Sequence, residues 1–175
     1  DFKSPYACSK GSADQYVLDY ARVFNLNTIV FRHSSVYGGR QFFTYDQGWV
    51  GWFCAQAVKH KLLTQSKFSI TGNGKQVRDL VHINDITKLY KLAFRNFIKL
   101  RGKAYNIGGE YFCEIGDILN FLIDRSTFKE KIKITIDKKR LRPIDADLQI
   151  PNSNKFKKQF KWKPKYKFET TMNDL

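Results

Sequence analysis

Segments that alternate between helical and strand patterns constrain the fold of this chain most strongly. Residues 5–24 show the apolar spacing of an amphipathic helix, which Asn25-Leu26-Asn27 interrupts. The next residues, 28–32, form an apolar and β-branched run that is typical of a strand buried on both faces. Similar patterns predict strands at 68–71, 79–82, 104–108 and 133–136, and helices at 49–61, 84–96 (capped by Asn84 or Asp85), 115–126 and 153–160. This alternation predicts an α/β fold with parallel strands.

The sequence lacks the glycine-rich turn that binds a dinucleotide. No Gly-x-Gly-x-x-Gly or looser relative follows a first strand, because the sequence opens on a helix. Gly72-Asn73-Gly74 lies between two expected strands, where it predicts a hairpin turn. We therefore expect the sequence to start inside a longer protein, with the N-terminal half of that protein absent.

Composition indicates a globular domain and argues against several other classes. Of the 175 residues, 42% are hydrophobic and 15% aromatic, more than a disordered chain carries. No apolar run is long enough to span a bilayer, and no signal peptide is visible. Cys8, Cys54 and Cys113 are widely spaced, which argues against a zinc site or a disulfide framework. We expect a cytoplasmic protein without a metal or a membrane partner.

The formal net charge of +15 makes nucleic-acid binding an alternative that must be weighed. The lysines are scattered and concentrate only between Lys155 and Lys167, where they alternate with aromatic residues. No zinc-finger spacing or basic-region heptad accompanies them. We therefore favour a solvated lysine-rich surface together with a cleft that binds phosphate, and we expect no nucleic-acid partner. Binding that weakens steeply with salt would instead indicate a basic nucleic-acid-binding module.

Tyr6 and Lys10 form a Tyr-x-x-x-Lys pair at the start of the first expected helix. Ser4 suits the N-cap and Pro5 the first helical position, because the missing N–H of proline is unpaired there anyway. A spacing of four residues places both side chains on one helix face. A lysine ammonium stabilises a nearby phenolate and lowers the tyrosine pKa toward a range useful for proton transfer. The pair alone is a weak signal, because short motifs often arise by chance.

Five segments in a fixed order carry a more specific signal; they are residues 6–10, 31–38, 72–85, 105–109 and 141–145. Together they resemble the extended short-chain dehydrogenase/reductase family of nucleotide-sugar epimerases and dehydratases, over nearly the whole chain. The resemblance implies the second half of a doubly wound Rossmann-type parallel sheet plus a smaller mixed α/β substrate-binding subdomain. It places residues 1–48 in the C-terminal part of the NAD-binding domain. Residues 49–175 then belong mostly to the nucleotide-sugar-binding subdomain, with interleaved returns to the Rossmann sheet.

The resemblance also implies roles for individual residues on the cofactor side. Tyr6 is expected to be the catalytic acid and base. Lys10 is expected to lower the pKa of Tyr6 and to bind the nicotinamide ribose of NAD. The loop that follows the buried strand lies over the nicotinamide in this family, which points to His33 and Ser34 as cofactor-binding residues.

On the substrate side, the resemblance implies contacts from Ser35, Tyr37, Arg40, Arg78, Arg142 and Asp145. Arg78 and Arg142 match arginines that hold the pyrophosphate or nucleotide, and a planar guanidinium binds phosphate oxygens in pairs. Many relatives carry asparagine where this chain has Ser35, so the contact made at this position stays open.

Residues 32–42 and 46–54 narrow the resemblance to the CDP-paratose 2-epimerase branch of the family. This branch implies inversion at C2 of a nucleotide-diphosphate sugar, preferably a CDP-sugar, by a homo-oligomeric enzyme that keeps its NAD bound. A 4-epimerase or a 4,6-dehydratase of the same family is the alternative, which residues upstream of Tyr6 would distinguish. The 175-residue chain by itself is expected to be inactive.

Overall fold

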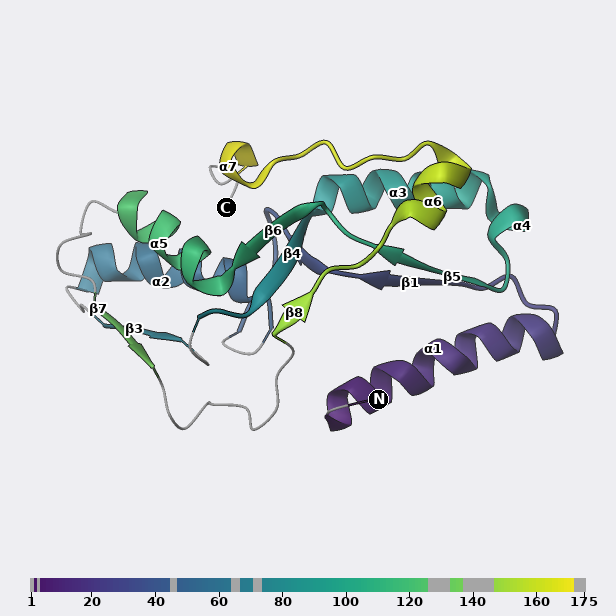
Figure 1. The fold of residues 1–175 in the computed structure, drawn as a ribbon, viewed down its shortest axis with the longest axis horizontal. Coiled ribbons are helices and arrows are strands. Elements are labelled where there is room, and N and C mark those ends of the chain that lie inside the picture. The colour runs from purple at the N-terminus through teal and green to yellow at the C-terminus, as the bar shows by residue number, and fades with distance from the viewer. Residues whose placement is uncertain are drawn as a thin grey trace.

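The computed structural model describes residues 2, 4–44, 47–63, 67–70, 74–125, 133–136 and 147–171. Helices there are α1 (Pro5–Val23), α2 (Trp49–Leu63), α3 (Ile83–Arg95), α4 (Phe97–Leu100), α5 (Ile115–Arg125), α6 (Asn154–Phe160) and α7 (Phe168–Thr171). The strands are β1 (Ile29–His33), β2 (Ser35–Tyr37), β3 (Lys67–Ile70), β4 (Val77–His82), β5 (Lys103–Ile107), β6 (Tyr111–Glu114), β7 (Lys133–Ile136) and β8 (Leu148–Gln149). Helices and strands alternate along most of the chain (Figure 1), which confirms the predicted α/β class.

Helix α1 begins as the sequence predicts. The Ser4 hydroxyl oxygen accepts a hydrogen bond from the backbone N–H of Ala7 at 3.1 Å, and Pro5 occupies the first helical position. The chain leaves the helix at Phe24. Ala21 is the one residue of α1 that is fully buried by the described part of the protein, so the helix packs through a narrow face.

Strand pairing divides the strands into three groups. Strands β1 and β5 run parallel, as do β3 and β7. Strand β4 pairs with three other strands. Its pairings with β2 and β8 are parallel and its pairing with β6 is antiparallel, so this sheet is mixed. Residues 72 and 73 of the expected hairpin turn lie outside the described residues. Within the described strands, β3 pairs with β7 and β4 with β2, β6 and β8, so these pairings do not support a β3–β4 hairpin. Gly74 nevertheless has a φ of 78°, a backbone conformation that favours glycine.

Two hydrophobic cores hold these elements together. One lies between the β1–β5 pair and helices α3 and α6, and its buried members are Val81, Ile86, Leu89, Ala93, Leu100, Tyr105, Ile107, Phe156 and Trp162. The other joins α2 and α5 to the sheet centred on β4, with Tyr37, Val50, Phe53, Leu80, Cys113, Ile118, Leu119, Leu122 and Phe168. Figure 1 shows α1 beneath the β1–β5 pair, on the side opposite α3 and α6.

Asp79 fixes the turn between β5 and β6. Its buried carboxylate accepts hydrogen bonds from the backbone N–H groups of Gly109 at 2.7 Å and Tyr111 at 3.0 Å. A Cβ atom at Gly109 would lie 1.8 Å from the carbonyl oxygen of Leu80, so only glycine fits there. Burial raises the pKa of Asp79, and the hydrogen bonds from the two amides oppose that rise. Asp79 therefore positions the turn.

The cap of α3 differs from the prediction. His82 caps the helix, since its Nδ1 accepts a hydrogen bond from the backbone N–H of Asn84 at 3.2 Å. Asp85 instead accepts from the backbone N–H groups of Lys165 and Tyr166, at 2.8 and 3.0 Å. The predicted capping by Asn84 or Asp85 is wrong because Asp85 faces the C-terminal segment and stabilises its attachment to α3.

Candidate functional site

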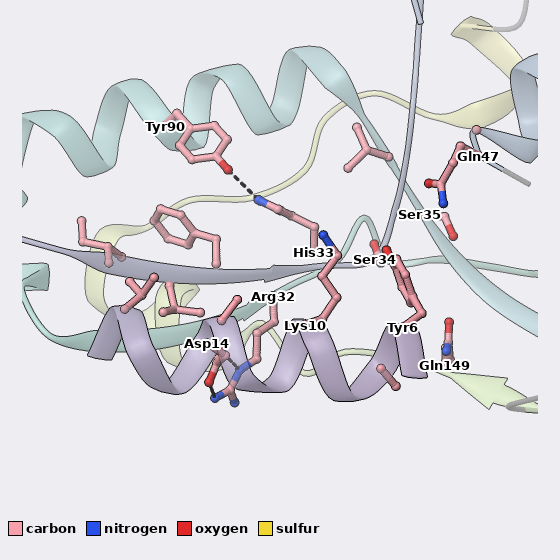
Figure 2. Close-up of a pocket in the computed structure, with 18 of the residues that line it drawn as sticks. Tyr6, Lys10, Asp14, Arg32, His33, Ser34, Ser35, Gln47, Tyr90 and Gln149 are labelled. Carbon is pink, nitrogen blue, oxygen red and sulfur yellow. Dashed lines mark hydrogen bonds and ion pairs between the residues drawn. The ribbon is translucent and has the colours of Figure 1, made fainter. Parts of the chain in front are cut away.

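A groove of about 2250 Å³ opens between α1, β1 and α3 (Figure 2). Polar side chains in its walls include Tyr6, Lys10 and Asp14 from α1, Arg32 and His33 from β1, and Tyr90 from α3. Ser34 and Ser35 follow directly after β1 and line the same groove. The groove therefore collects residues from segments that are far apart in the sequence.

Tyr6 and Lys10 lie one turn apart on the face of α1 that borders the groove. The Nζ atom of Lys10 is 5.4 Å from the centroid of the Tyr6 ring. Figure 2 shows both side chains rising from α1 toward Ser34 and the end of β1. Neither Tyr6 nor Lys10 is buried, and Lys10 forms no ion pair within the described residues. Among the described residues, no carboxylate therefore competes with the phenol or with ligand oxygens for the Lys10 ammonium.

His33 brings an imidazole to the end of β1. Its Nε2 lies 2.9 Å from the hydroxyl oxygen of Tyr90, whereas its buried Nδ1 has no hydrogen-bond partner in the described part of the chain. Burial lowers the pKa of His33 below its usual value of 6.5, so the ring is neutral at physiological pH. The imidazole therefore retains one ring nitrogen for a ligand.

Ser35 and Arg78 border the groove where the sheet centred on β4 begins. Ser35 lies opposite Leu80 in the β2–β4 pairing, and Arg78 stands two residues earlier on β4. The Arg78 side chain is mostly buried, and its Nη1 donates to the carbonyl oxygen of Val77 at 3.0 Å. The first residue of α2, Trp49, also lines this end of the groove. A guanidinium and a helix N-terminus together favour an anionic ligand group.

Other residues expected at the substrate are not brought to this groove. Tyr37 is only 2% exposed, and its hydroxyl oxygen lies 2.9 Å from Oγ1 of Thr171 inside the core. Arg40 is exposed in a turn with a φ of 64° and does not line the groove. Arg142 and Asp145 lie outside the described residues.

Two groove residues that sequence reasoning overlooked form an ion pair. Nε and Nη2 of Arg32 donate to the two carboxylate oxygens of Asp14, at 2.8 and 2.7 Å. The pKa of Asp14 is lowered, and the hydrogen bond from Arg32 is the largest cause. Asp14 follows Lys10 by four residues, so helical periodicity could have found it. Tyr90 carries no such signal, because its approach to His33 depends on how α3 packs.

The groove provides hydroxyl, ammonium, imidazole and guanidinium groups. No group of three or more His, Cys, Asp or Glu side chains placed to hold a metal ion occurs within the described ranges. None of the helices in those ranges combines the length and apolar character needed to cross a membrane. The available groups match ligands that are rich in hydroxyl and phosphate oxygens.

Comparison with known proteins identifies the family. The model of the family described as GDP-mannose 4,6 dehydratase matches residues 2–175. The CDP-paratose 2-epimerase of Salmonella typhi is 66% identical over 109 residues, which make up 62% of this chain and 32% of that protein. The dTDP-glucose 4,6-dehydratase of Neisseria gonorrhoeae is 33% identical over 107 residues, or 61% of this chain and 28% of that protein.

Solved structures share the fold. A dTDP-glucose 4,6-dehydratase from Bacillus anthracis in complex with NAD has a TM-score of 0.74 at 29% identity, over 97% of this chain and 50% of that one. A UDP-glucose 4-epimerase with UDP-glucose from Thermotoga maritima has a TM-score of 0.77 at 25% identity, over 96% of this chain and 50% of that one. The chain thus spans about half the length of these two structures. The family match over residues 2–175 shows that the chain belongs to the GDP-mannose 4,6 dehydratase family, among the nucleotide-sugar epimerases and dehydratases of the extended short-chain dehydrogenase/reductase type.

Proposed function

We propose that this chain is the C-terminal part of an NAD-dependent nucleotide-sugar epimerase, a CDP-paratose 2-epimerase that forms CDP-tyvelose. The observation that carries the proposal is the groove in which Tyr6 and Lys10 face the end of β1. The 66% identity to the Salmonella typhi enzyme supports the choice of reaction. In this proposal residues 1–48 belong to the NAD-binding domain and residues 49–175 mostly to the sugar-nucleotide subdomain. The full-length enzyme is a cytoplasmic homo-oligomer.

The groove contains groups that fit a nicotinamide cofactor. NAD, when bound, supplies the redox chemistry at the sugar carbon. Lys10 has an ammonium without a carboxylate partner among the described residues, which suits ribose hydroxyls. His33 has a buried ring nitrogen without a partner there, which suits a polar group of the cofactor. In the proposal these two residues, with Ser34, hold the nicotinamide end of NAD.

Tyr6 moves the proton in the proposed reaction. As phenolate it accepts the proton of the C2 hydroxyl, and as phenol it returns a proton to the oxygen after the sugar has presented its other face. The Lys10 ammonium stabilises the phenolate, because a nearby positive charge favours the anionic form. One proton is taken and one returned at the oxygen, so Tyr6 ends in its starting state. Inversion at C2 itself would require the reversible redox chemistry that NAD supplies when bound, so the sugar would show no net oxidation.

Arg78 and the N-terminus of α2 bind the substrate diphosphate in the proposal, and Ser35 lies beside them. The Arg78 guanidinium carries a positive charge and the N-terminus of α2 a partial positive charge, and both attract phosphate oxygens. A 4,6-dehydratase or a 4-epimerase is the second candidate, and the likeness to the Bacillus anthracis and Thermotoga maritima structures favours it. The two candidates share the roles of Tyr6 and Lys10 and differ in the sugar carbon that reacts.

The test is turnover of CDP-paratose by the full-length enzyme, followed by NMR of the sugar. We expect CDP-tyvelose to form, and Tyr6→Phe to lower the rate by about 10²–10⁴-fold while CDP binding persists. Tyr16→Phe removes another exposed hydroxyl from α1 and serves as the control with the parent rate. Turnover of dTDP-glucose or UDP-glucose in place of CDP-paratose would favour the second candidate. Near-parent turnover by Tyr6→Phe would remove Tyr6 from the acid/base role.

A further inference from the structure

Helix α1 carries Tyr6 and Lys10 but is weakly packed against the part of the protein that the structure describes. Ala21, near its C-terminal end, is its one fully buried residue there. Thr28 adds a polar contact at the same end, since its hydroxyl donates to the carbonyl oxygen of Val17 at 2.7 Å. Among the described residues, hydrophobic burial therefore contributes little to holding the first turns of α1, which carry the two reactive side chains.

The Asp14–Arg32 pair supplies a contact where burial does not. Two nearly parallel hydrogen bonds, 2.8 and 2.7 Å long, join one guanidinium edge to both carboxylate oxygens (Figure 2). Such a bidentate pair restrains the relative orientation of its two partners as well as their distance. The Asp14 side chain is only 12% exposed but the Arg32 side chain is 50% exposed, so solvent still screens part of the charge interaction and the restraint comes mainly from the two hydrogen bonds. The pair also raises the pKa of Arg32 and lowers that of Asp14.

The location of the pair matters for the proposed reaction. Asp14 lies one turn beyond Lys10 on the helix face that carries Tyr6. Arg32 directly precedes His33 on β1. One bidentate contact therefore connects the helix that holds the acid/base residues to the strand end that holds the cofactor-side residues.

We propose that Asp14 and Arg32 are positioning residues whose bidentate pair sets Tyr6 and Lys10 against the end of β1. This inference rests on the proposed function, because it concerns the geometry of the proposed proton transfer. Asp14 and Arg32 act through the backbone of α1 and β1 and do not touch the reacting atoms. A displacement of about 1 Å at a reacting group can lower a rate by about 10²-fold, so loss of the pair has a kinetic effect.

The test uses Asp14→Asn in the full-length enzyme, because this change keeps the side-chain shape and removes the charge. We expect kcat to fall by about 10- to 100-fold while the Kd for CDP stays at the parent value. Arg32→Lys keeps the charge without the planar fork, and its kcat should fall between the parent and Asp14→Asn.

Two comparisons separate positioning from general stabilisation. Asp19→Asn removes an exposed carboxylate that pairs with Arg22 on the same helix, and it should keep the parent kcat and the parent Kd for CDP. The double variant Asp14→Asn/Arg32→Gln should be no slower than Asp14→Asn alone, because both changes remove one interaction.

The positioning role would be overturned if the parent enzyme depends on Tyr6 and Asp14→Asn nevertheless keeps the parent kcat. A lower melting temperature with unchanged kinetics would overturn it equally. Failure of the proposed function is a different result, in which the parent enzyme does not epimerise or Tyr6→Phe remains active. If Asp14→Asn does not fold, Arg32→Lys decides between the outcomes by the same measurements.

Discussion

The hydroxyl oxygen of Tyr90 lies 2.9 Å from Nε2 of His33, which joins α3 to the last residue of β1 at the edge of the groove. The Tyr90 ring also packs edge-on against Phe31, with ring centroids 5.4 Å apart. Tyr90→Phe would therefore remove the hydroxyl contact with His33 and keep the ring contact with Phe31. Because Tyr90 occupies Nε2, the imidazole can use only its buried Nδ1 to bind a further partner.

His33 should make stability depend on pH. Burial lowers its pKa in the folded protein, so between that pKa and about 6.5 the unfolded chain binds more protons than the folded one. The free energy of unfolding should therefore rise with pH through this interval and fall as the solution is acidified. Denaturant unfolding between pH 5 and 7, together with an NMR titration of His33, measures the effect. His33→Asn should flatten this part of the profile, and an unchanged slope in that variant would assign the dependence to other groups.

Replacement of Asp79 should destabilise the fold without touching the groove-facing residues of α1. The two carboxylate oxygens of Asp79 accept hydrogen bonds from two backbone N–H groups. In Asp79→Asn one oxygen remains an acceptor, but an NH₂ group replaces the other and faces a backbone N–H, so two donors meet without an acceptor. A buried donor left unpaired costs about 1–3 kcal/mol, so the free energy of unfolding should drop by that amount. Asp124→Asn, at an exposed position of α5, is the matched control and should change stability little. Equal stabilities of the two variants would refute the role given to Asp79.

Arg78 should contribute affinity for the nucleotide diphosphate. Arg78→Lys keeps one positive charge but cannot make paired contacts with phosphate oxygens, so CDP binding should weaken and Arg78→Ala should weaken it further. Calorimetry with CDP measures both variants in the full-length enzyme. Arg101→Ala removes an exposed arginine that follows α4 and does not line the groove, and it provides a comparison of equal charge. Affinity at the parent value in both Arg78 variants would exclude a phosphate contact from this residue.

The longer elements of the fold could be predicted because their sequence patterns are local. The α1 helix combines a capping serine, a proline and an interruption after 24, and β1 is an uninterrupted β-branched run. Strands β2 and β8 are only three and two residues long, which is too short for a periodic signal. The cap at His82 escaped prediction since an imidazole nitrogen replaces the usual oxygen acceptor.

The candidate site could be predicted only in part, for a similar reason. Tyr6 and Lys10 share a helix face, so their spacing alone places them together. Tyr37 sits in the same motif as Ser35, yet packing against His82 and Phe168 places its ring in the core. Contacts between distant elements, such as Tyr90 with His33, depend on tertiary packing that a local pattern does not contain.

The isolated 175-residue chain should associate with itself and hold no NAD. Large apolar side chains are exposed on α3 and α4, where Phe94 is 82% and Ile98 88% accessible. Strand β1 pairs with β5 alone among the described strands, so its other edge offers unpaired backbone groups. Exposed apolar surface and a free strand edge both favour association, and the groove beside β1 is open on that side.

Gel filtration with absorbance measurement of bound nicotinamide compares the isolated chain with the full-length enzyme. We expect large assemblies without NAD for the isolated chain and a discrete species with NAD for the full-length enzyme. Phe94→Ser/Ile98→Ser should reduce the assembled fraction, because it removes the two most exposed apolar side chains of α3 and α4. Lys91→Ser/Lys99→Ser changes exposed residues of the same two helices and should not reduce it. A monodisperse isolated chain with stoichiometric NAD would contradict the prediction and would place the whole cofactor site within these 175 residues.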